Sequence, residues 1–256
     1  MTLDTITQRA RKFWKVASTF PPTKEQIYVD HAKAQEFDRW KAKAPLNVLE
    51  YGCGGGSDAL SYLRRGHRVV ATDISAINVA STGVRIREDL EGVAFHNRHA
   101  IWLLTHPDRI APITGSEALQ AAQVGQHLGP IDAELGAKPF DLASAHGVLH
   151  HIPQPLVSRV VAEIHRVLRP GGWFYAMLYT PRLEREHAKA MQLLIKRYGL
   201  APEEALGWLT EGEGCPWTEV YTLSQAAALF EPAGFVIKSS FDYADGFFRT
   251  YRMVRK

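Results

Sequence analysis

The stretch Val48-Leu-Glu-Tyr-Gly-Cys-Gly-Gly-Gly-Ser57 decides the fold. A short β-rich run ends at Tyr51, a glycine-rich turn follows, and a helix is expected from Ser57 to Arg65. Such a turn between a strand and a helix lets the backbone approach a ligand closely. The next predicted strand ends at Asp73, which can accept hydrogen bonds from the hydroxyls of a ribose beside that turn. Together these features predict a nucleoside-cofactor site.

The elements around this turn alternate between strand and helix, which predicts a parallel sheet with right-handed crossovers. Ser57 is expected to cap the first of these helices, and Gly66 to follow its end. A tight Ala244-Asp-Gly246 turn predicts a closing antiparallel hairpin, and Leu200–Glu219 is expected to be irregular. Strands are expected at Leu46–Tyr51, His67–Thr72, Val93–His96, Phe140–Ala145, Trp173–Tyr179, Gly234–Phe241 and Phe247–Val254. Helices are expected at Arg9–Val16, Thr23–Lys43, Ser57–Arg65, Ser75–Leu90, Ser116–His127, Gln154–Leu168, Arg182–Tyr198 and Ser224–Phe230.

Length and composition exclude several classes of protein. The chain has 256 residues, with 46% hydrophobic and 22% charged residues, which is ordinary for a globular protein and excludes disordered and fibrous classes. The net charge of +3 is too small to indicate a nucleic-acid partner. The two cysteines form no zinc motif or disulfide framework, and no metal site is expected. No secretory signal or membrane-spanning run is apparent, so we expect a cytoplasmic protein with no membrane association.

The acidic residue before the glycines narrows the choice of cofactor. The dinucleotide fingerprint Gly-x-Gly-x-x-Gly would need a glycine where this chain has Ser57. Glu50 lies two positions before Gly52, and a carboxylate would repel a pyrophosphate group. The same carboxylate suits a cofactor whose amino-acid end carries a positive charge.

These residues resemble the class I S-adenosylmethionine-dependent methyltransferases. Glu50-Tyr-Gly-Cys-Gly-Gly-Gly56 resembles the family's first motif, and Asp73 resembles its acidic ribose ligand. Phe140-Asp-Leu-Ala-Ser-Ala-His-Gly-Val-Leu-His-His-Ile152 is similar to its fourth-strand segment. Glu163-Ile-His-Arg-Val-Leu-Arg-Pro-Gly-Gly172 is similar to the run before its fifth strand. Four motifs in order, from about Leu46 to Met253, make the resemblance specific.

The resemblance implies a doubly wound, Rossmann-like α/β sheet of seven strands, mostly parallel with an antiparallel strand 7, and here an N-terminal helical arm. It implies S-adenosylmethionine as cofactor and S-adenosylhomocysteine as product. It further implies that Glu50 orients the cofactor's amino group, that Asp73 holds the ribose and that Ile74 packs on the adenine. Other expected cofactor contacts are Gly52, Cys53, Gly54 and Ser144, with His99 and Ala100 matching the adenine-contacting pair after strand 3. His99 departs from the family's usual aspartate there.

The chemistry of in-line methyl transfer asks mainly for alignment and exclusion of water. If the acceptor carries a proton, a general base helps, and histidine suits that work. His146 is our candidate catalytic residue facing the acceptor, with a purely structural hydrogen-bonding role as the alternative. The adjacent His150 and His151 fall in a common family sequence, so we expect them to be structural.

The acceptor site is expected outside the core sheet. We divide the chain into a helical arm or lid over residues 1–44 and a methyltransferase domain over residues 45–256, with an insertion at about 100–138. Tyr28 and His31 are lid candidates, although their stretch is equally consistent with simple packing. Trp217 and Tyr221 are candidates for another wall of the acceptor site.

The resemblance therefore implies an enzyme that methylates an oxygen, nitrogen or carbon of a small molecule, without a nucleic-acid partner, as a monomer or homodimer. One alternative is a tRNA or protein methyltransferase. The alternative from another class is a non-catalytic regulatory domain that binds S-adenosylmethionine.

Overall fold

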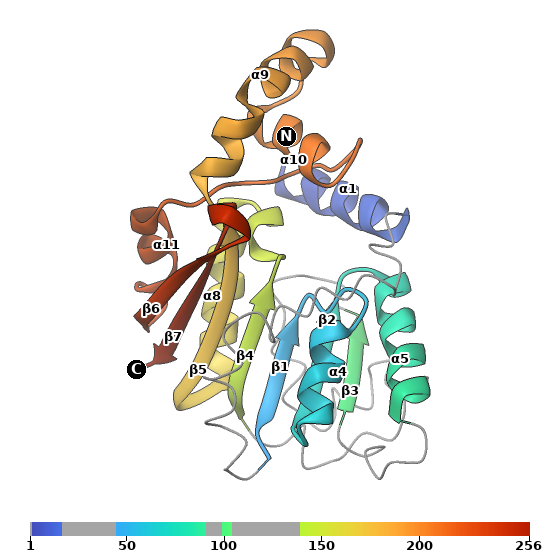
Figure 1. The fold of residues 1–256 in the computed structure, drawn as a ribbon, viewed down its shortest axis with the longest axis vertical. Helices are drawn as coiled ribbons and strands as arrows, with labels where there is room; N and C mark the ends of the chain where they lie inside the picture. Colours follow the sequence, from blue (N-terminus) through green and yellow to red (C-terminus); the bar gives the residue numbers. More distant parts are fainter. Residues whose placement is uncertain (1, 17–44, 91–98, 104–138) are drawn as a thin grey trace.

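The strand that precedes the glycine turn lies inside a mixed sheet of order β3-β2-β1-β4-β5-β7-β6 (Figure 1). The computed structural model describes residues 2–16, 45–90, 99–103 and 139–256. Strands β1 to β5 run parallel, whereas β7 is antiparallel to both β5 and β6. The largely parallel sheet with a reversed last strand was predicted correctly. The strands are β1 (Asn47–Tyr51), β2 (Arg68–Asp73), β3 (His99–Leu103), β4 (Phe140–His146), β5 (Leu168–Tyr179), β6 (Phe235–Tyr243) and β7 (Phe248–Arg255).

Helices cover both faces of this sheet, because successive strand residues point to opposite sides. Val48 packs in a cluster with residues of α4 and α5, whereas its neighbour Leu49 packs in a cluster with residues of α8 and α11. Two cores therefore lie on opposite faces of the sheet. Figure 1 shows the helices that cover these faces. The helices are α1 (Leu3–Val16), α4 (Ser57–Arg64), α5 (Ala76–Leu90), α8 (Gln154–Val167), α9 (Pro181–Tyr198), α10 (Pro202–Thr210) and α11 (Leu223–Phe230).

The order of the strands reverses between β1 and β4, whose neighbours are β2 and β5. Loops on the two sides of such a reversal diverge and leave a crevice at the carboxyl ends of the strands. The glycine turn after β1 and the end of β4 both lie at this edge, and the topology therefore places the candidate site there.

Two predicted helix caps were wrong. Gly56, with φ of 79°, is the N-cap of α4 and Ser57 is its first residue. A left-handed backbone at this position favours glycine, so the turn itself decides where the helix starts. Helix α11 begins after Thr222, whose hydroxyl accepts from the Gln225 amide at 3.2 Å, and not at Ser224.

The segment expected to be irregular contains a helix, α10. Pro202 opens it, where the missing amide hydrogen of proline costs nothing. The Glu204 carboxylate accepts from the amide of Ala201 at 3.2 Å. Gly207 then lets Cys215 approach so closely that an added Cβ would lie 3.0 Å from its Sγ. Gly207 lowered the apparent helical propensity of the segment, although it serves close packing here.

Strand β3 differs most from expectation. It spans His99–Leu103, whereas the predicted strand at Val93–His96 falls outside the described residues. The predicted helices at Thr23–Lys43 and Ser116–His127 also fall outside them. Helix α1 begins six residues earlier than its predicted start at Arg9.

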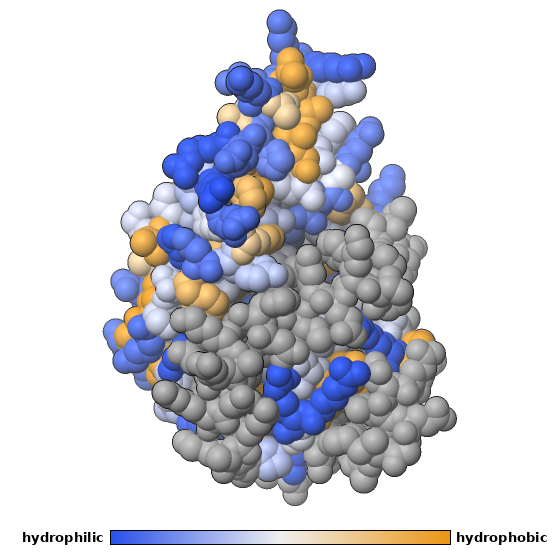
Figure 2. All heavy atoms as spheres, in the orientation of Figure 1, coloured by the Kyte–Doolittle hydropathy of each residue, from blue (hydrophilic) through white to orange (hydrophobic). Residues whose placement is uncertain are grey.

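Helix α9 projects from the sheet at one end of the molecule, beside α10 (Figure 1). Figure 2 shows apolar surface at that end, where Leu193 of α9 is 68% exposed. No helix among the described residues is long and apolar enough to cross a membrane.

Candidate active site

The glycine turn after β1 is closed by its own backbone hydrogen bonds. The amides of Gly52 and Cys53 both donate to the carbonyl of Thr72 on β2, each at 2.8 Å. The amide of Gly56 donates to the carbonyl of Cys53 at 2.8 Å. The amides of the predicted cofactor residues Gly52 and Cys53 are therefore engaged within the protein and are not free donors for a ligand.

The glycines of this turn divide into packing positions and open positions. A Cβ on Gly52 would lie 2.7 Å from Val148 Cγ2, and a Cβ on Gly56 would lie 2.6 Å from Thr82 Cγ2. At Gly54 and Gly55 no described atom lies within 4 Å of the added Cβ. The open side of the turn is thus a cradle that a ligand can approach.

Asp73 ends β2 and braces the cradle. Its Oδ2 accepts from the Gly54 amide at 2.9 Å, and its Oδ1 accepts from the Ser75 amide at 2.8 Å and from Asn78 Nδ2 at 3.3 Å. Burial raises the pKa of Asp73, although these donors oppose the shift. The backbone of Ile74 also acts as a donor to this carboxylate. A carboxylate has about four acceptor sites, so Asp73 is chiefly engaged in holding the turn. Ile74, the next residue, is half-buried.

Glu50 lies two residues before the first glycine, and its carboxyl is only 5% exposed. Its Oε2 has no hydrogen-bond partner among the described residues. Burial raises the pKa of Glu50 well above its ordinary value, and the nearby charges of Asp58 and Asp73 raise it further. Three carboxyl groups thus share one buried region at the carboxyl edge of the sheet. A cationic ligand there would relieve their mutual repulsion.

His146 ends β4 and pairs with Asp58 in the first turn of α4. Its Nδ1 lies 2.8 Å from Asp58 Oδ2, and the two side chains are 4% and 6% exposed. Sequence reasoning singled out His146 but missed Asp58, because 88 residues separate the pair and no motif marks the aspartate. The only signal for Asp58 was an acidic residue in the first turn of the predicted helix.

Ser144 is fully buried in β4, opposite Glu50 of β1 in the sheet register. It interacts with the hydroxyl of Tyr62, a core residue of α4. Its complete burial does not support the predicted direct contact with a cofactor, which stays a prediction.

His99 and Ala100 do not lie where their predicted role requires. They begin β3 and pair with Val69 and Val70, near the amino end of β2, whereas Asp73 pairs with Leu103. At about 3.3 Å per residue, His99 lies more than 10 Å along the strands from the cofactor edge. This register does not support the adenine contact predicted for the pair, which stays a prediction. The strand begins after the point where it was expected to end.

Helix α1 docks on the same edge. The Ser75 hydroxyl donates to the carbonyl of Trp14 at 2.9 Å, and the Trp14 ring lies 5.2 Å from the ring of His151. Arg9 forms a 2.6 Å ion pair with Glu204 of α10. Helix α1 thus connects the loop after β2 with the helices above β5 (Figure 1).

The histidine pair after β4 packs beneath α1. The His150 ring lies 4.0 Å from that of Tyr179, and burial lowers the pKa of His150 well below its ordinary value. His151 Nδ1 lies 3.0 Å from Thr218 Oγ1, and its Nε2 lies 3.6 Å from Glu211 Oε1. These contacts agree with the structural role expected for the pair.

The residues predicted to line the acceptor site lie in different environments. Tyr221 is 1% exposed, belongs to the core against α8 and α11, and donates to Glu219 at 2.8 Å. Its place in the core does not support the predicted role as a wall of the acceptor site. Trp217 is half-buried, and its carbonyl lies 3.3 Å from His151 Nδ1. Tyr28 and His31 lie outside the described residues.

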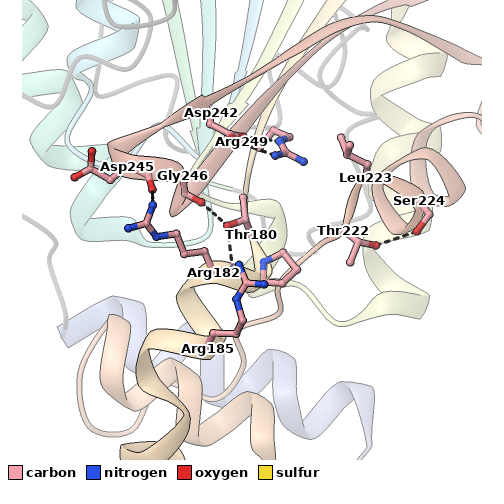
Figure 3. A pocket seen from close by; sticks show the side chains of 11 residues that line it. Thr180, Arg182, Arg185, Thr222, Leu223, Ser224, Asp242, Asp245, Gly246 and Arg249 are labelled. Atoms are coloured by element: carbon pink, nitrogen blue, oxygen red, sulfur yellow. Dashed lines mark hydrogen bonds and ion pairs between the residues drawn. The ribbon is translucent and has the colours of Figure 1, made fainter.

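A separate groove of about 890 Å³ lies between the start of α9, the start of α11 and the β6–β7 hairpin (Figure 3). Arg249 forms a bidentate pair with Asp242, at 2.5 and 3.1 Å. Arg182 donates to the carbonyl of Asp245, and the Thr180 hydroxyl donates to that of Gly246. These contacts fasten the hairpin tip to the start of α9.

The site thus combines an open glycine cradle, a buried carboxyl cluster and a histidine–aspartate pair at one edge of the sheet. It can hold a ligand that has both a cationic group and ribose-like hydroxyls. Among the described residues, no cluster of three or more histidine, cysteine or acidic side chains is arranged to bind a metal ion.

Comparison with known proteins agrees with this geometry. Residues 26–240 match the profile of a family described as "Methyltransferase domain". A ubiquinone biosynthesis O-methyltransferase of Chromobacterium violaceum is 26% identical over 173 residues, which cover 68% of this chain. The same alignment covers 60% of that relative, so the chain spans about 60% of its length.

Two solved structures share the fold. Magnesium protoporphyrin IX methyltransferase from Synechocystis PCC 6803 with bound SAH has a TM-score of 0.61 at 16% identity, covering 98% of this chain and 100% of that one. The 1,6-didemethyltoxoflavin-N1-methyltransferase of Burkholderia thailandensis was crystallised with 1,6-didemethyltoxoflavin and S-adenosylhomocysteine. It has a TM-score of 0.62 at 16% identity, covering 100% of this chain and 91% of that one.

Proposed function

Because the chain belongs to the methyltransferase domain family, we propose that it transfers a methyl group from S-adenosylmethionine to an oxygen, nitrogen or carbon of a small molecule. The observation that carries this proposal is the open cradle at Gly54 beside the buried carboxyls of Glu50 and Asp73. The donor molecule carries an ammonium group, a sulfonium group and a ribose, which complement this combination of features.

In this proposal Glu50 binds the amino group of the donor, because its Oε2 is buried without a partner among the described residues. Asp73, which ends β2 beside the cradle, binds the ribose hydroxyls. Gly54 allows close approach of the methionine part, and Ile74 packs on the adenine. When bound, S-adenosylmethionine supplies an electrophilic methyl group on a positively charged sulfur.

The protein's own contribution is binding, orientation and exclusion of water. We assign residues 45–256 to the methyltransferase domain and residues 1–44 to an arm that closes over it, with an insertion at about 100–138 beside the acceptor. The docking of α1 through Trp14 on the edge of the site supports the arm as a lid.

The three known proteins described above support a small acceptor, since their names specify ubiquinone biosynthesis, magnesium protoporphyrin IX and 1,6-didemethyltoxoflavin. We further propose a cytoplasmic protein that works as a monomer or homodimer without a nucleic-acid partner. Sedimentation of the full chain measures the oligomeric state.

The test is a titration with S-adenosylmethionine by calorimetry, followed by transfer of labelled methyl to a panel of small metabolites, tRNA and protein. Binding together with labelling of a small molecule is the expected result. If only tRNA or protein is labelled, the acceptor is a macromolecule and not a small molecule. If S-adenosylmethionine binds but no methyl group is transferred, the result favours a non-catalytic regulatory domain.

A further inference from the structure

The contact between His146 and Asp58 favours one tautomer of the imidazole. A carboxylate can only accept hydrogen bonds, so beside a carboxylate Nδ1 of His146 carries the hydrogen that is shared with Asp58 Oδ2 at 2.8 Å. In the neutral ring, Nε2 then holds the lone pair. Asp58 thus selects the tautomer in which the far nitrogen of the imidazole can accept a proton.

The pair is built by two different elements of the fold. His146 is the last residue of β4, and Asp58 lies in the first turn of α4, where the helix dipole favours a negative charge. Both side chains are almost fully buried. The imidazole is therefore fixed in direction as well as in tautomer, which a surface histidine would not be.

The pair lies beside the proposed methyl-donor site. Val148, two residues after His146, is the side chain that a Cβ on Gly52 would strike at 2.7 Å. Asp58 is close enough to Glu50 for its charge to raise the pKa of that carboxyl. The end of β4 and the cradle therefore form one continuous region at the carboxyl edge of the sheet.

We propose that Asp58 is a positioning residue that holds His146 as a general base, and that the acceptor atom is a hydroxyl oxygen that loses its proton during transfer. This inference rests on the proposed methyltransferase function. As the oxygen–methyl bond forms, the sulfur–methyl bond breaks and sulfur keeps the electron pair. The hydroxyl proton moves to Nε2 of His146, and Asp58 stabilises the resulting imidazolium before the proton passes to water. Acceptors that lose no proton, such as a thioether, would not need this arrangement.

Other charged and titratable groups surround the pair. Tyr62 lies on the same helix as Asp58, Glu50 lies on β1 and Asp73 on β2, and Tyr175 on β5 interacts with Tyr62. From α5, Arg85 donates to the hydroxyl of Ser57, the residue before Asp58, at 2.6 Å. A pH profile alone would therefore mix several titrations, and the test needs a probe of His146 itself.

The first readout does not depend on activity. Nitrogen NMR of ¹⁵N-histidine-labelled protein, with His146→Gln for assignment, should show His146 as the Nδ1–H tautomer. In Asp58→Asn that preference should weaken or reverse, whereas Asp242→Asn, which removes a carboxylate from the distant hairpin, should leave it unchanged. An Nε2–H tautomer in the wild-type protein would overturn the proposal.

The second readout uses two acceptors, phenol and 4-nitrophenol, at about pH 8.5. Phenol keeps its proton there, whereas the more acidic 4-nitrophenol has lost it. His146→Gln should lower kcat for phenol about 100-fold or more and that for 4-nitrophenol only a few-fold. Asp58→Asn should show the same pattern with a smaller loss for phenol. Equal losses for both probes would show a structural role instead.

Calorimetric titration separates failure of this inference from failure of the proposed function. Both variants should bind S-adenosylmethionine within about threefold of wild type, which also verifies that they fold. If wild type binds the donor but methylates neither phenol, the hydroxyl-acceptor proposal is wrong while the methyltransferase proposal stands. If wild type binds no S-adenosylmethionine, the proposed function itself fails.

Discussion

The hydroxyl of Ser75 donates a hydrogen bond to the main-chain carbonyl of Trp14 at 2.9 Å. Ser75 is also the residue whose amide binds the Asp73 carboxylate, at 2.8 Å. One residue thus connects helix α1 to the acid at the end of β2. Occupation of the cofactor site and docking of α1 are therefore expected to be coupled.

Trp14→Ala should loosen α1. The variant loses the ring contact with His151, which together with lost burial is worth about 1–3 kcal/mol. Hydrogen exchange of the α1 amides should accelerate roughly tenfold or more. Gln8→Ala, an exposed position on the same helix, is the control and should exchange like wild type. Unchanged protection in Trp14→Ala would show that α1 is held by other contacts.

Deletion of residues 1–24 should impair acceptor turnover more than donor affinity, because the arm is proposed to close over the acceptor. The measurement is steady-state turnover of the best acceptor beside calorimetric binding of S-adenosylmethionine. Full activity in the truncated protein would reject the lid.

Asp73→Ala should weaken binding of S-adenosylmethionine by about 1–3 kcal/mol through the loss of charged hydrogen bonds. It should also destabilise the fold, because the amides of Gly54 and Ser75 lose their acceptor. Calorimetry and chemical denaturation measure the two effects. Asp242→Ala, which removes a half-exposed carboxylate on β6, should leave donor affinity at the wild-type value. An unchanged affinity in Asp73→Ala would remove Asp73 from the site.

Gly54→Ala separates backbone strain from obstruction of the cradle. Gly54 has φ of 51° and open space around its added Cβ, and Gly199 at the end of α9 shares both properties, with φ of 66°. Each substitution should cost about 1 kcal/mol of stability through the left-handed backbone. Only Gly54→Ala should weaken donor binding, by about tenfold or more. Equal affinities in the two variants would mean that the open face of the turn is not the binding surface.

The raised pKa of Glu50 predicts a characteristic pH dependence. The folded protein keeps the Glu50 proton at pH values where the unfolded chain has lost it, so this group lowers stability as pH rises through the raised pKa. Asp73, whose pKa is also raised, acts in the same direction, whereas the lowered pKa of His150 makes stability rise with pH up to the ordinary histidine range. The difference between wild type and Glu50→Gln in urea denaturation isolates the first contribution, which should grow with pH.

The same group should report on the donor. A cation bound at Glu50 favours the ionised carboxylate, so binding should release a proton and strengthen as pH rises. Calorimetry in two buffers of different ionisation enthalpy measures that proton. In Glu50→Gln the release should disappear and affinity should fall about tenfold or more. Equal proton release in both proteins would contradict the assignment of the donor's amino group to Glu50.

The sequence was most informative where one residue type satisfies a local requirement. The glycines after Tyr51 predicted the turn, because only glycine readily adopts the left-handed φ values found there. Asp73 was predicted as a site residue, and its carboxylate accepts a hydrogen bond from the amide of Gly54. The start of α4 at Ser57 was predicted, but its N-cap, Gly56, was missed, because a serine at the start of a helix is usually its cap.

Long-range relationships were not predictable in this way. The sequence around Tyr221 does not show whether this residue lies in the core or lines a cavity. Its burial depends on α8 and α11, which fold against it. Asp58 meets His146 only because α4 and β4 converge on one edge of the sheet. His99 and Ala100 were displaced by the start of β3, which no cap or turn residue marks.

The position of β7 bears on how the chain reaches its native state. Strand β7 follows β6 in the sequence, yet it lies between β5 and β6, and among the described strands only β7 pairs with β6. During synthesis β6 therefore leaves the ribosome before β7, the described strand with which it pairs. Tyr251 and Met253 of β7 complete the core on the α8 side, so that core cannot close until these residues are free. Substitutions in β7 should consequently affect yield and aggregation during expression, even though the strand lies several strands away from the cofactor cradle.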